Sequence, residues 1–236
     1  HVAAVHCETT SGLLNPIAEL GAVTRRFAKT YVVDAISSFA AVPMDCEAAG
    51  IDFLISSPNK CIEGVPGFSF VLCRRAKLLA SEGWSRTLSF DLLDQLKGFE
   101  KNGQFRYTPP THSILAFERA LEELDQEGGI PGRAARYRRN QEVLASGMAG
   151  IGFRSYLSPT VQSYIITSFY FPSDPKFTFE DFYRRLSEKG FIIYPGKISQ
   201  ADLFRIGSIG RIFEEDIRAL LRAVREVVAE MGLRMG

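Results

Sequence analysis

Residues 51–73 read IDFLISSPNKCIEGVPGFSFVLC, so one lysine, Lys60, stands between two apolar runs. The runs at 51–55 and 68–73 are short and rich in Ile, Phe, Leu and Val, which predicts two buried β-strands. The loop that joins them continues after the lysine with two glycines and a proline, which turn and restrict the backbone. A lysine between core strands can lose part of its hydration, and a neutral amine is a nucleophile. Lys60 is therefore a candidate catalytic residue, and a surface lysine on a turn is the plain alternative.

A further apolar run, at residues 31–36, carries a carboxylate, Asp34, near its C-terminal end. In open α/β sheets, ligands bind outside the carboxyl ends of the strands. Only the strand at 51–55 separates Asp34 from Lys60 along the chain, so both side chains can face one crevice from neighbouring strand ends. A lysine that attaches to an aldehyde cofactor and an aspartate that keeps a pyridine nitrogen protonated are the pair that pyridoxal phosphate (PLP) chemistry needs.

Motifs in several parts of the chain resemble those of one known family. They are HCETTxGxLNP at residues 6–16, VDAxSS at 33–38, DFLISSxNKCIxGVPGF at 52–68, TxPTH at 108–112 and FRIGxIG at 204–210. Together they resemble the 2-aminoethylphosphonate–pyruvate transaminases, in the alanine–glyoxylate-like, class-V branch of the fold-type I PLP enzymes. The NKCIxGVPG run is the most specific of these motifs, and the resemblance covers essentially the whole chain.

The resemblance implies an α/β protein with the fold of the type I PLP-dependent transferases. Residues 1–128 would form the C-terminal part of the PLP-binding large domain, with a mostly parallel sheet, and residues 129–236 a small C-terminal α/β domain. The glycine-rich segment 128–132 is expected to mark the break between them. Full-length relatives carry a further N-terminal portion. We therefore expect this chain to lack some strands of the large domain and the main loop that binds the cofactor phosphate.

The resemblance also implies roles for individual residues. Lys60 would hold PLP and act as the base that moves a proton at the substrate carbon. Asp34 would pair with the pyridine nitrogen, and Thr9 would hydrogen-bond the cofactor near its ring hydroxyl. Thr108 would reach the cofactor phosphate of the other subunit in a homodimer with shared active sites. Arg205 would bind the anionic group of the substrate, because a guanidinium can donate two parallel hydrogen bonds to a carboxylate or phosphonate.

Other interpretations of these polar residues stay open. Asp34 and Thr9 can be turn residues that follow strands. Thr108 can simply be a threonine before two prolines, and Arg205 can form a surface ion pair. His6 is given no role, because transamination does not require a histidine.

The composition excludes several other classes of protein. The chain has 236 residues, a net charge of +1, 46% hydrophobic residues and 23% charged residues, as in ordinary globular proteins. It contains no basic run that would favour nucleic acid and no apolar run near the roughly 20 residues of a membrane span. The four cysteines are scattered without a CxxC motif, which argues against a structural metal and for a reduced, cytoplasmic protein.

Hydrophobic periodicity predicts the order of the remaining elements. A strand–helix–strand unit spans residues 2–36, with Asn15 as the helix N-cap, and this unit predicts parallel strands. Residues 81–110 show no clear pattern. The later elements are a helix from 109–111 onward, a basic helix at 133–148, a strand at 161–171, a helix capped by Thr178, strands at 191–194 and 203–206, and a last helix at 214–231.

Three functional hypotheses follow from these patterns. The first is transfer of the amino group of 2-aminoethylphosphonate to pyruvate, which gives phosphonoacetaldehyde and alanine. The second keeps the fold and changes the substrates to those of an alanine– or serine–glyoxylate transaminase. The third is a shortened chain that folds but binds PLP unproductively, because the phosphate loop is missing.

Overall fold

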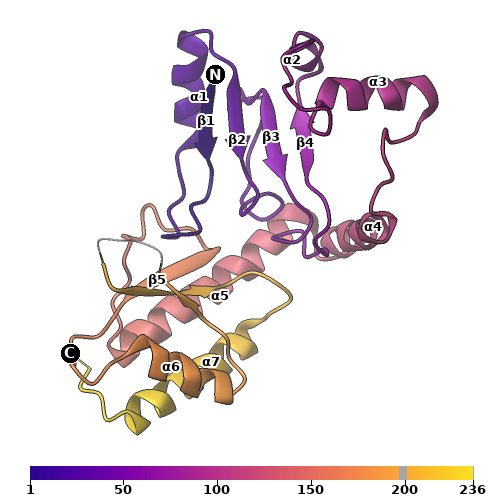
Figure 1. Ribbon diagram of the computed structural model, residues 1–236. Coiled ribbons are helices and arrows are strands. Elements are labelled where there is room, and N and C mark those ends of the chain that lie inside the picture. Colours follow the sequence, from indigo (N-terminus) through magenta and orange to yellow (C-terminus); the bar gives the residue numbers. More distant parts are fainter. Residues whose placement is uncertain (197–200, 236) are drawn as a thin grey trace. The chain divides into compact units, whose positions relative to one another are not determined.

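The computed structural model describes residues 1–196 and 201–235, and its contacts divide the chain into two compact units (Figure 1). Unit 1 comprises residues 1–5, 16–36 and 44–123, and unit 2 comprises residues 6–15, 37–43 and 124–236. The segments 6–15 and 37–43 thus belong with the C-terminal residues, although they follow strands of unit 1. The predicted domain division after residue 128 stays a prediction.

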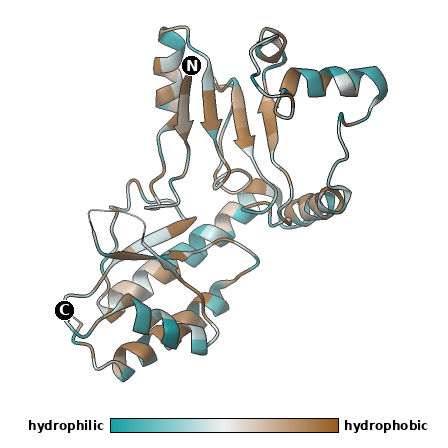
Figure 2. Cartoon of the chain, viewed as in Figure 1, coloured by the Kyte–Doolittle hydropathy of each residue, from teal (hydrophilic) through white to brown (hydrophobic). Residues whose placement is uncertain are grey.

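Unit 1 is built on a four-stranded sheet in the order β1-β2-β3-β4. Its strands and helices are β1 (Val2–Val5), α1 (Ile17–Arg26), β2 (Tyr31–Asp34), β3 (Phe53–Ser56), β4 (Phe70–Cys73), α2 (Arg75–Leu79), α3 (Leu92–Asn102) and most of α4 (Thr111–Gln126). The pairs β1–β2 and β2–β3 are parallel, and β4 runs antiparallel to β3. The mostly parallel sheet and the strand–helix–strand unit at its start are therefore confirmed. Figure 2 shows these strands as largely apolar.

Helix α1 differs from the prediction at its first residue. Pro16 occupies the N-cap position and no side chain caps the helix. Asn15, one residue earlier, lies in the preceding loop, where its backbone N–H donates to the carbonyl of His6 at 2.8 Å.

Strand β4 is less buried than its apolar sequence suggests. It is the last strand of the sheet, and Leu72 is 48% exposed. The segment 81–110, for which no regular structure was expected, contains helix α3. Asp91 caps this helix by accepting a hydrogen bond from the Asp94 N–H at 3.0 Å, and Gly103 ends it in the left-handed conformation.

Unit 2 contains a three-stranded antiparallel sheet, in the order β5-β7-β6, packed with helices. Its elements are α5 (Gly129–Ile151), β5 (Ile166–Tyr170), α6 (Phe179–Glu188), β6 (Tyr194–Pro195), β7 (Leu203–Gly207) and α7 (Glu214–Glu230). Phe169 and Phe204 lie opposite each other on β5 and β7, and with Phe182 they form the centre of the core. The α/β class of this C-terminal part and the buried stripe on α7 are confirmed.

Several boundaries in unit 2 needed correction. The strand predicted at 161–171 is shorter, and the one predicted at 191–194 is replaced by the two-residue β6. Most of segment 128–132 is helical, because α5 begins at Gly129 soon after α4 ends. Gly132 permits this tight junction, since a Cβ there would lie 1.9 Å from the carbonyl oxygen of Glu127.

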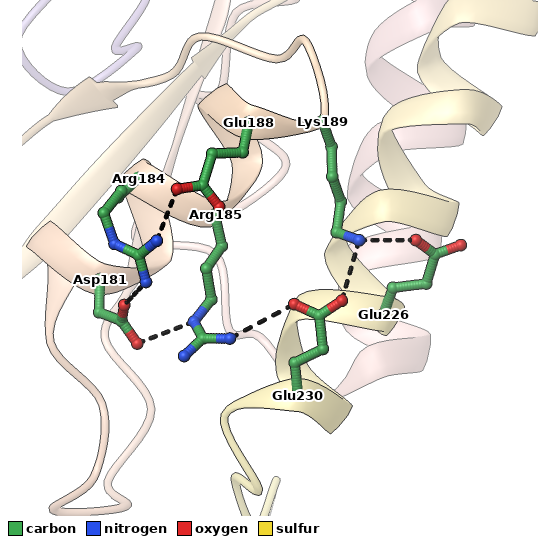
Figure 3. A network of polar contacts seen from close by, with 7 residues as sticks. All are labelled: Asp181, Arg184, Arg185, Glu188, Lys189, Glu226 and Glu230. Atoms are coloured by element: carbon green, nitrogen blue, oxygen red, sulfur yellow. Dashed lines mark hydrogen bonds and ion pairs between the residues drawn. The ribbon is translucent and has the colours of Figure 1, made fainter.

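Ion pairs connect the outer surfaces of α6 and α7 (Figure 3). Lys189, just after α6, lies 3.1 Å from Glu226 and 2.9 Å from Glu230, and Arg185 lies 3.4 Å from Glu230. Because these groups lie at the surface, solvent screens each pair and its contribution to stability is small. They do, however, direct the carboxylates of α7 toward α6.

Candidate active site

Asp34 lies at the carboxyl end of a central strand of unit 1. It pairs with Ile55 across the parallel β2–β3 ladder, and β2 has neighbours on both sides. Its Oδ1 accepts a hydrogen bond from the Ile36 N–H at 2.9 Å, which fixes the half-buried carboxylate at the strand end. Within the described residues its Oδ2 has no hydrogen-bond partner. This oxygen is therefore left to accept a hydrogen bond from a ligand.

Lys60 lies in the turn that leaves β3, the strand next to Asp34. The turn closes through hydrogen bonds from the Glu63 N–H to the Lys60 carbonyl at 2.9 Å and from the Gly64 N–H to the Pro58 carbonyl at 2.8 Å. The lysine is partly buried and, in the part of the chain that the structure describes, makes no ion pair. The turn thus places Lys60 four residues beyond the carboxyl end of β3, and no carboxylate in the described residues pairs with its amine.

The end of the lysine loop is anchored to helix α4. Ser113 Oγ donates to the Pro66 carbonyl at 3.2 Å. Gly67 is required at this approach, because a Cβ there would lie 2.3 Å from Ser113 Oγ. Thr108, three residues before α4, is exposed and lies in the same unit as Asp34 and Lys60.

The other two predicted residues, Thr9 and Arg205, come together in unit 2. The Arg205 Nη1 donates to the Thr9 carbonyl oxygen, and its Nε donates to the Pro195 carbonyl at 3.0 Å. Arg205 as a residue is 7% exposed, and burial lowers the pKa of its guanidinium. Its nearest aromatic ring is Tyr194, on the neighbouring strand, with the guanidinium carbon 6.0 Å from the ring centroid.

A buried cation without an anion is costly, so the state of Arg205 matters chemically. Both of its hydrogen bonds go to neutral carbonyl groups, and no carboxylate pairs with it among residues 1–196 and 201–235. The surface ion pair considered as its alternative role is not present in this part of the chain. The arrangement instead suits an anionic ligand, which would supply the missing negative charge.

Comparison with known proteins places this geometry in a family. Residues 1–212 match the class-V aminotransferase family. The chain belongs to the class-V aminotransferases. The fold prediction of a type I PLP-dependent transferase agrees with this membership and with the solved structures that the chain resembles.

Solved structures similar to this class-V aminotransferase chain have the same fold at low sequence identity. The pyridoxamine–pyruvate aminotransferase of Mesorhizobium loti has a TM-score of 0.90 at 22% identity and is matched over 100% of this chain and 61% of its own. The alanine–glyoxylate aminotransferase of Nostoc sp. has a TM-score of 0.85 at 24% identity, over 96% of this chain and 61% of its own.

Curated relatives are closer in sequence. The 2-aminoethylphosphonate–pyruvate transaminase of Salmonella typhimurium strain LT2 is 56% identical over 226 residues, which are 95% of this chain and 62% of the relative. The same enzyme of Salmonella heidelberg matches to the same extent. The chain thus spans 62% of the length of these relatives.

A buried histidine joins two of the motifs of this aminotransferase chain and was given no role from sequence. His6 Nδ1 lies 2.8 Å from Ser38 Oγ, and both side chains are buried in unit 2. Burial lowers the pKa of His6 from 6.5 to about 4, so the ring is neutral at pH 7. Its position directly after an apolar strand is the only sequence signal that could have indicated burial.

This histidine predicts a pH dependence of stability. The unfolded chain binds a proton on His6 below pH about 6.5, whereas the folded chain binds it only near pH 4, so acid favours unfolding in this window. Between pH 7 and pH 5 we expect His6 to lower the free energy of unfolding by about 1–2 kcal/mol. Urea unfolding at both pH values measures this loss.

Two variants separate the contribution of His6 from that of other groups. His6→Gln is expected to remove the loss between pH 7 and pH 5, while His112→Gln, at an exposed position, is expected to keep it. The same pH dependence in wild type and His6→Gln would contradict the assignment.

Proposed function

We propose that this chain carries the PLP-binding lysine and the substrate-binding arginine of a transaminase that moves the amino group of 2-aminoethylphosphonate to pyruvate. Two observations support the proposal: the curated relatives with this name are 56% identical over nearly the whole chain, and the chain's own side chains suit the reaction. The observation that carries it is the buried Arg205 guanidinium, which lacks a carboxylate partner among the described residues.

The residues of unit 1 fit the cofactor. Asp34 offers an unpaired carboxylate oxygen to a protonated pyridine nitrogen, and Lys60 offers an amine that no acid in the described chain engages. We further assign Thr9 to the cofactor ring and Thr108 to the cofactor phosphate bound by a partner subunit. When bound, PLP supplies an electron sink for the carbon that bears the substrate amine.

The chain's own groups would perform the proton transfers and hold the substrate. The Lys60 Nζ would accept the proton from the amine-bearing carbon of the substrate, as a general base held near that atom. The Asp34 carboxylate would keep the pyridine nitrogen protonated, because a nearby negative charge favours the cationic ring.

Arg205 would bind the anion of each substrate in turn. The phosphonate of the amino donor and the carboxylate of pyruvate both accept two parallel hydrogen bonds from a guanidinium. Nε and Nη1 are held by the Pro195 and Thr9 carbonyls, so the orientation of the fork is fixed before the ligand arrives. Both half-reactions can therefore use the same anion site.

Arg205→Lys tests this role. A lysine keeps the charge but loses the fork, so we expect the KM for 2-aminoethylphosphonate to rise about 10- to 100-fold, as for the loss of one charge-assisted hydrogen bond. Steady-state kinetics with pyruvate as acceptor measures the change. Arg154→Lys is the matched control, since Arg154 also lies over a tyrosine ring but is exposed. An unchanged KM in Arg205→Lys would contradict the assignment.

The amino donor separates the two transaminase hypotheses. We expect turnover with 2-aminoethylphosphonate to exceed turnover with alanine or serine, measured for all three donors with glyoxylate as the acceptor, and for 2-aminoethylphosphonate and serine also with pyruvate. The reverse order would favour the alanine–glyoxylate type, to which the Nostoc structure belongs by name.

We also propose a cytoplasmic homodimer. Trp84, Leu88 and Phe90 are 61%, 69% and 81% exposed, and they precede Thr108 in the same unit. Such exposed aromatic and aliphatic side chains suit a subunit interface.

None of the helices in the described residues is long and apolar enough to cross a membrane. No group of three or more His, Cys, Asp or Glu in those residues could hold a metal ion.

A further inference from the structure

A groove of about 490 Å³ runs along the seam between α5 and α7, wholly within unit 2. Its walls are basic and its floor is apolar. The lining residues are Arg139, Glu142, Val143, Ser146 and Gly147 on α5, and Arg218, Leu221, Arg222 and Arg225 on α7. The volume lies in the range of small-ligand sites, which is about 300–1,000 Å³. None of these residues belongs to the proposed active site.

The floor of the groove depends on one glycine. A Cβ at Gly147 would lie 2.3 Å from the Leu221 side chain, so the missing side chain lets α7 approach α5 closely. Val143 and Leu221 are buried, while the arginines around them are exposed. The groove therefore presents guanidinium groups around a closed apolar base.

The charges of the groove are unbalanced. Glu214 pairs with both Arg139, at 2.6 Å, and Arg218, at 2.5 Å. Glu226 and Glu230, the two carboxylates of α7 that follow Arg222 and Arg225 in sequence, are engaged by Lys189 of the α6 side (Figure 3). These pairings leave the last two arginines of the groove without an acid.

Arg222 and Arg225 make no ion pair within residues 1–196 and 201–235, and both are exposed. They lie three positions apart on a helix, which places them on the same face. Among the described residues that line the groove, Glu142 is the only acidic one, and it makes no ion pair with another described residue. Two neighbouring free guanidiniums suit a ligand with two adjacent anionic groups, because each fork binds one phosphate.

We propose that the α5–α7 groove binds a small polyanion with two linked phosphate groups, on Arg222 and Arg225. The site is separate from the proposed transaminase site, and either proposal can fail without the other.

Isothermal titration calorimetry with inorganic pyrophosphate tests this site in the 236-residue chain. We expect one pyrophosphate-binding site per chain. Inorganic phosphate is expected to bind at least about tenfold more weakly than pyrophosphate, because it can engage only one of the two guanidinium groups. Arg222→Ala/Arg225→Ala is expected to weaken pyrophosphate binding at least about tenfold. Arg26→Ala/Arg234→Ala removes the same charge from exposed positions outside the groove and is expected to change the affinity less than about twofold.

A gain of affinity gives an independent test should the double variant fail to fold. Glu142→Gln removes the acid from the groove and is expected to tighten pyrophosphate binding about twofold or more. Arg205→Leu is expected to leave it unchanged. Loss of binding in Arg205→Leu would place the anion at the proposed substrate site and overturn the groove, while the transaminase proposal would stand.

Three further outcomes would overturn the proposal. They are no binding of pyrophosphate to the wild-type chain at about 1 mM, equal affinity in wild type and Arg222→Ala/Arg225→Ala, and tighter binding of a hexaglutamate peptide than of pyrophosphate. The last outcome would indicate an acidic protein segment as the occupant.

Discussion

Lys60→Ala is expected to lower kcat for transamination at least about 10³-fold, because the variant lacks both the amine that holds the cofactor and the base that moves the substrate proton. The fold is expected to survive, since the lysine is only partly buried and no ion pair in the described chain depends on it. Steady-state rates with 2-aminoethylphosphonate and pyruvate measure the loss, and circular dichroism checks the fold.

Lys29→Ala is the matched control for this variant, because Lys29 is exposed and lies outside the motifs of the site. It is expected to keep the wild-type rate. Because the chain spans 62% of its relatives, the same substitutions are also made in the Salmonella typhimurium relative, at the matching lysines. Steady-state turnover by Lys60→Ala within about tenfold of the wild type would remove Lys60 from the mechanism.

Asp34→Asn is expected to lower kcat by about 10²- to 10³-fold, because an amide cannot hold the pyridine nitrogen protonated as a carboxylate does. The backbone contact should persist, since the amide oxygen can still accept from the Ile36 N–H. The loss should therefore appear in kcat and in the absorbance of the bound cofactor, and not in stability.

Asp45→Asn provides a control with the same local geometry. Asp45 Oδ1 also accepts backbone N–H groups just ahead of it, from Glu47 and Ala48 at 2.9 Å, but it lies in an exposed turn. It is expected to keep full activity. Equal rates for Asp34→Asn and wild type would show that Asp34 is only a turn residue.

The sequence was sufficient for the parts of the fold that depend on local periodicity. The apolar runs that end at Asp34 and precede Lys60 predicted neighbouring parallel strands, and the ladder from Asp34 to Ile55 confirms them. Helix α7 could be predicted equally well from the sequence, because its buried residues repeat along one stripe.

Two helical features could not be predicted from the pattern of apolar residues. Helix α3 is hard to predict because it is short, contains Gly98 and buries only Leu93, while the Asp91 cap and the Gly103 ending mark its limits. The helical start at Gly129 cannot be predicted from composition, since glycines indicate a loop unless a close contact such as that of Gly132 requires them.

The candidate site could be predicted from the sequence only in part. Residue types and motifs indicated Lys60, Asp34 and Arg205, but the carbonyl contacts that fix Arg205 join residues far apart in sequence. The bond between His6 and Ser38 likewise joins two motifs, and neither residue signals it alone.

Borohydride reduction of the chain incubated with PLP, followed by peptide mass mapping, tests the central claim most directly. We expect a reduced pyridoxyl group on Lys60 that is absent from Lys60→Ala and from other lysines such as Lys29. A folded chain with no adduct on Lys60, or with the label spread over exposed lysines, would contradict the claim that this chain holds the cofactor through Lys60.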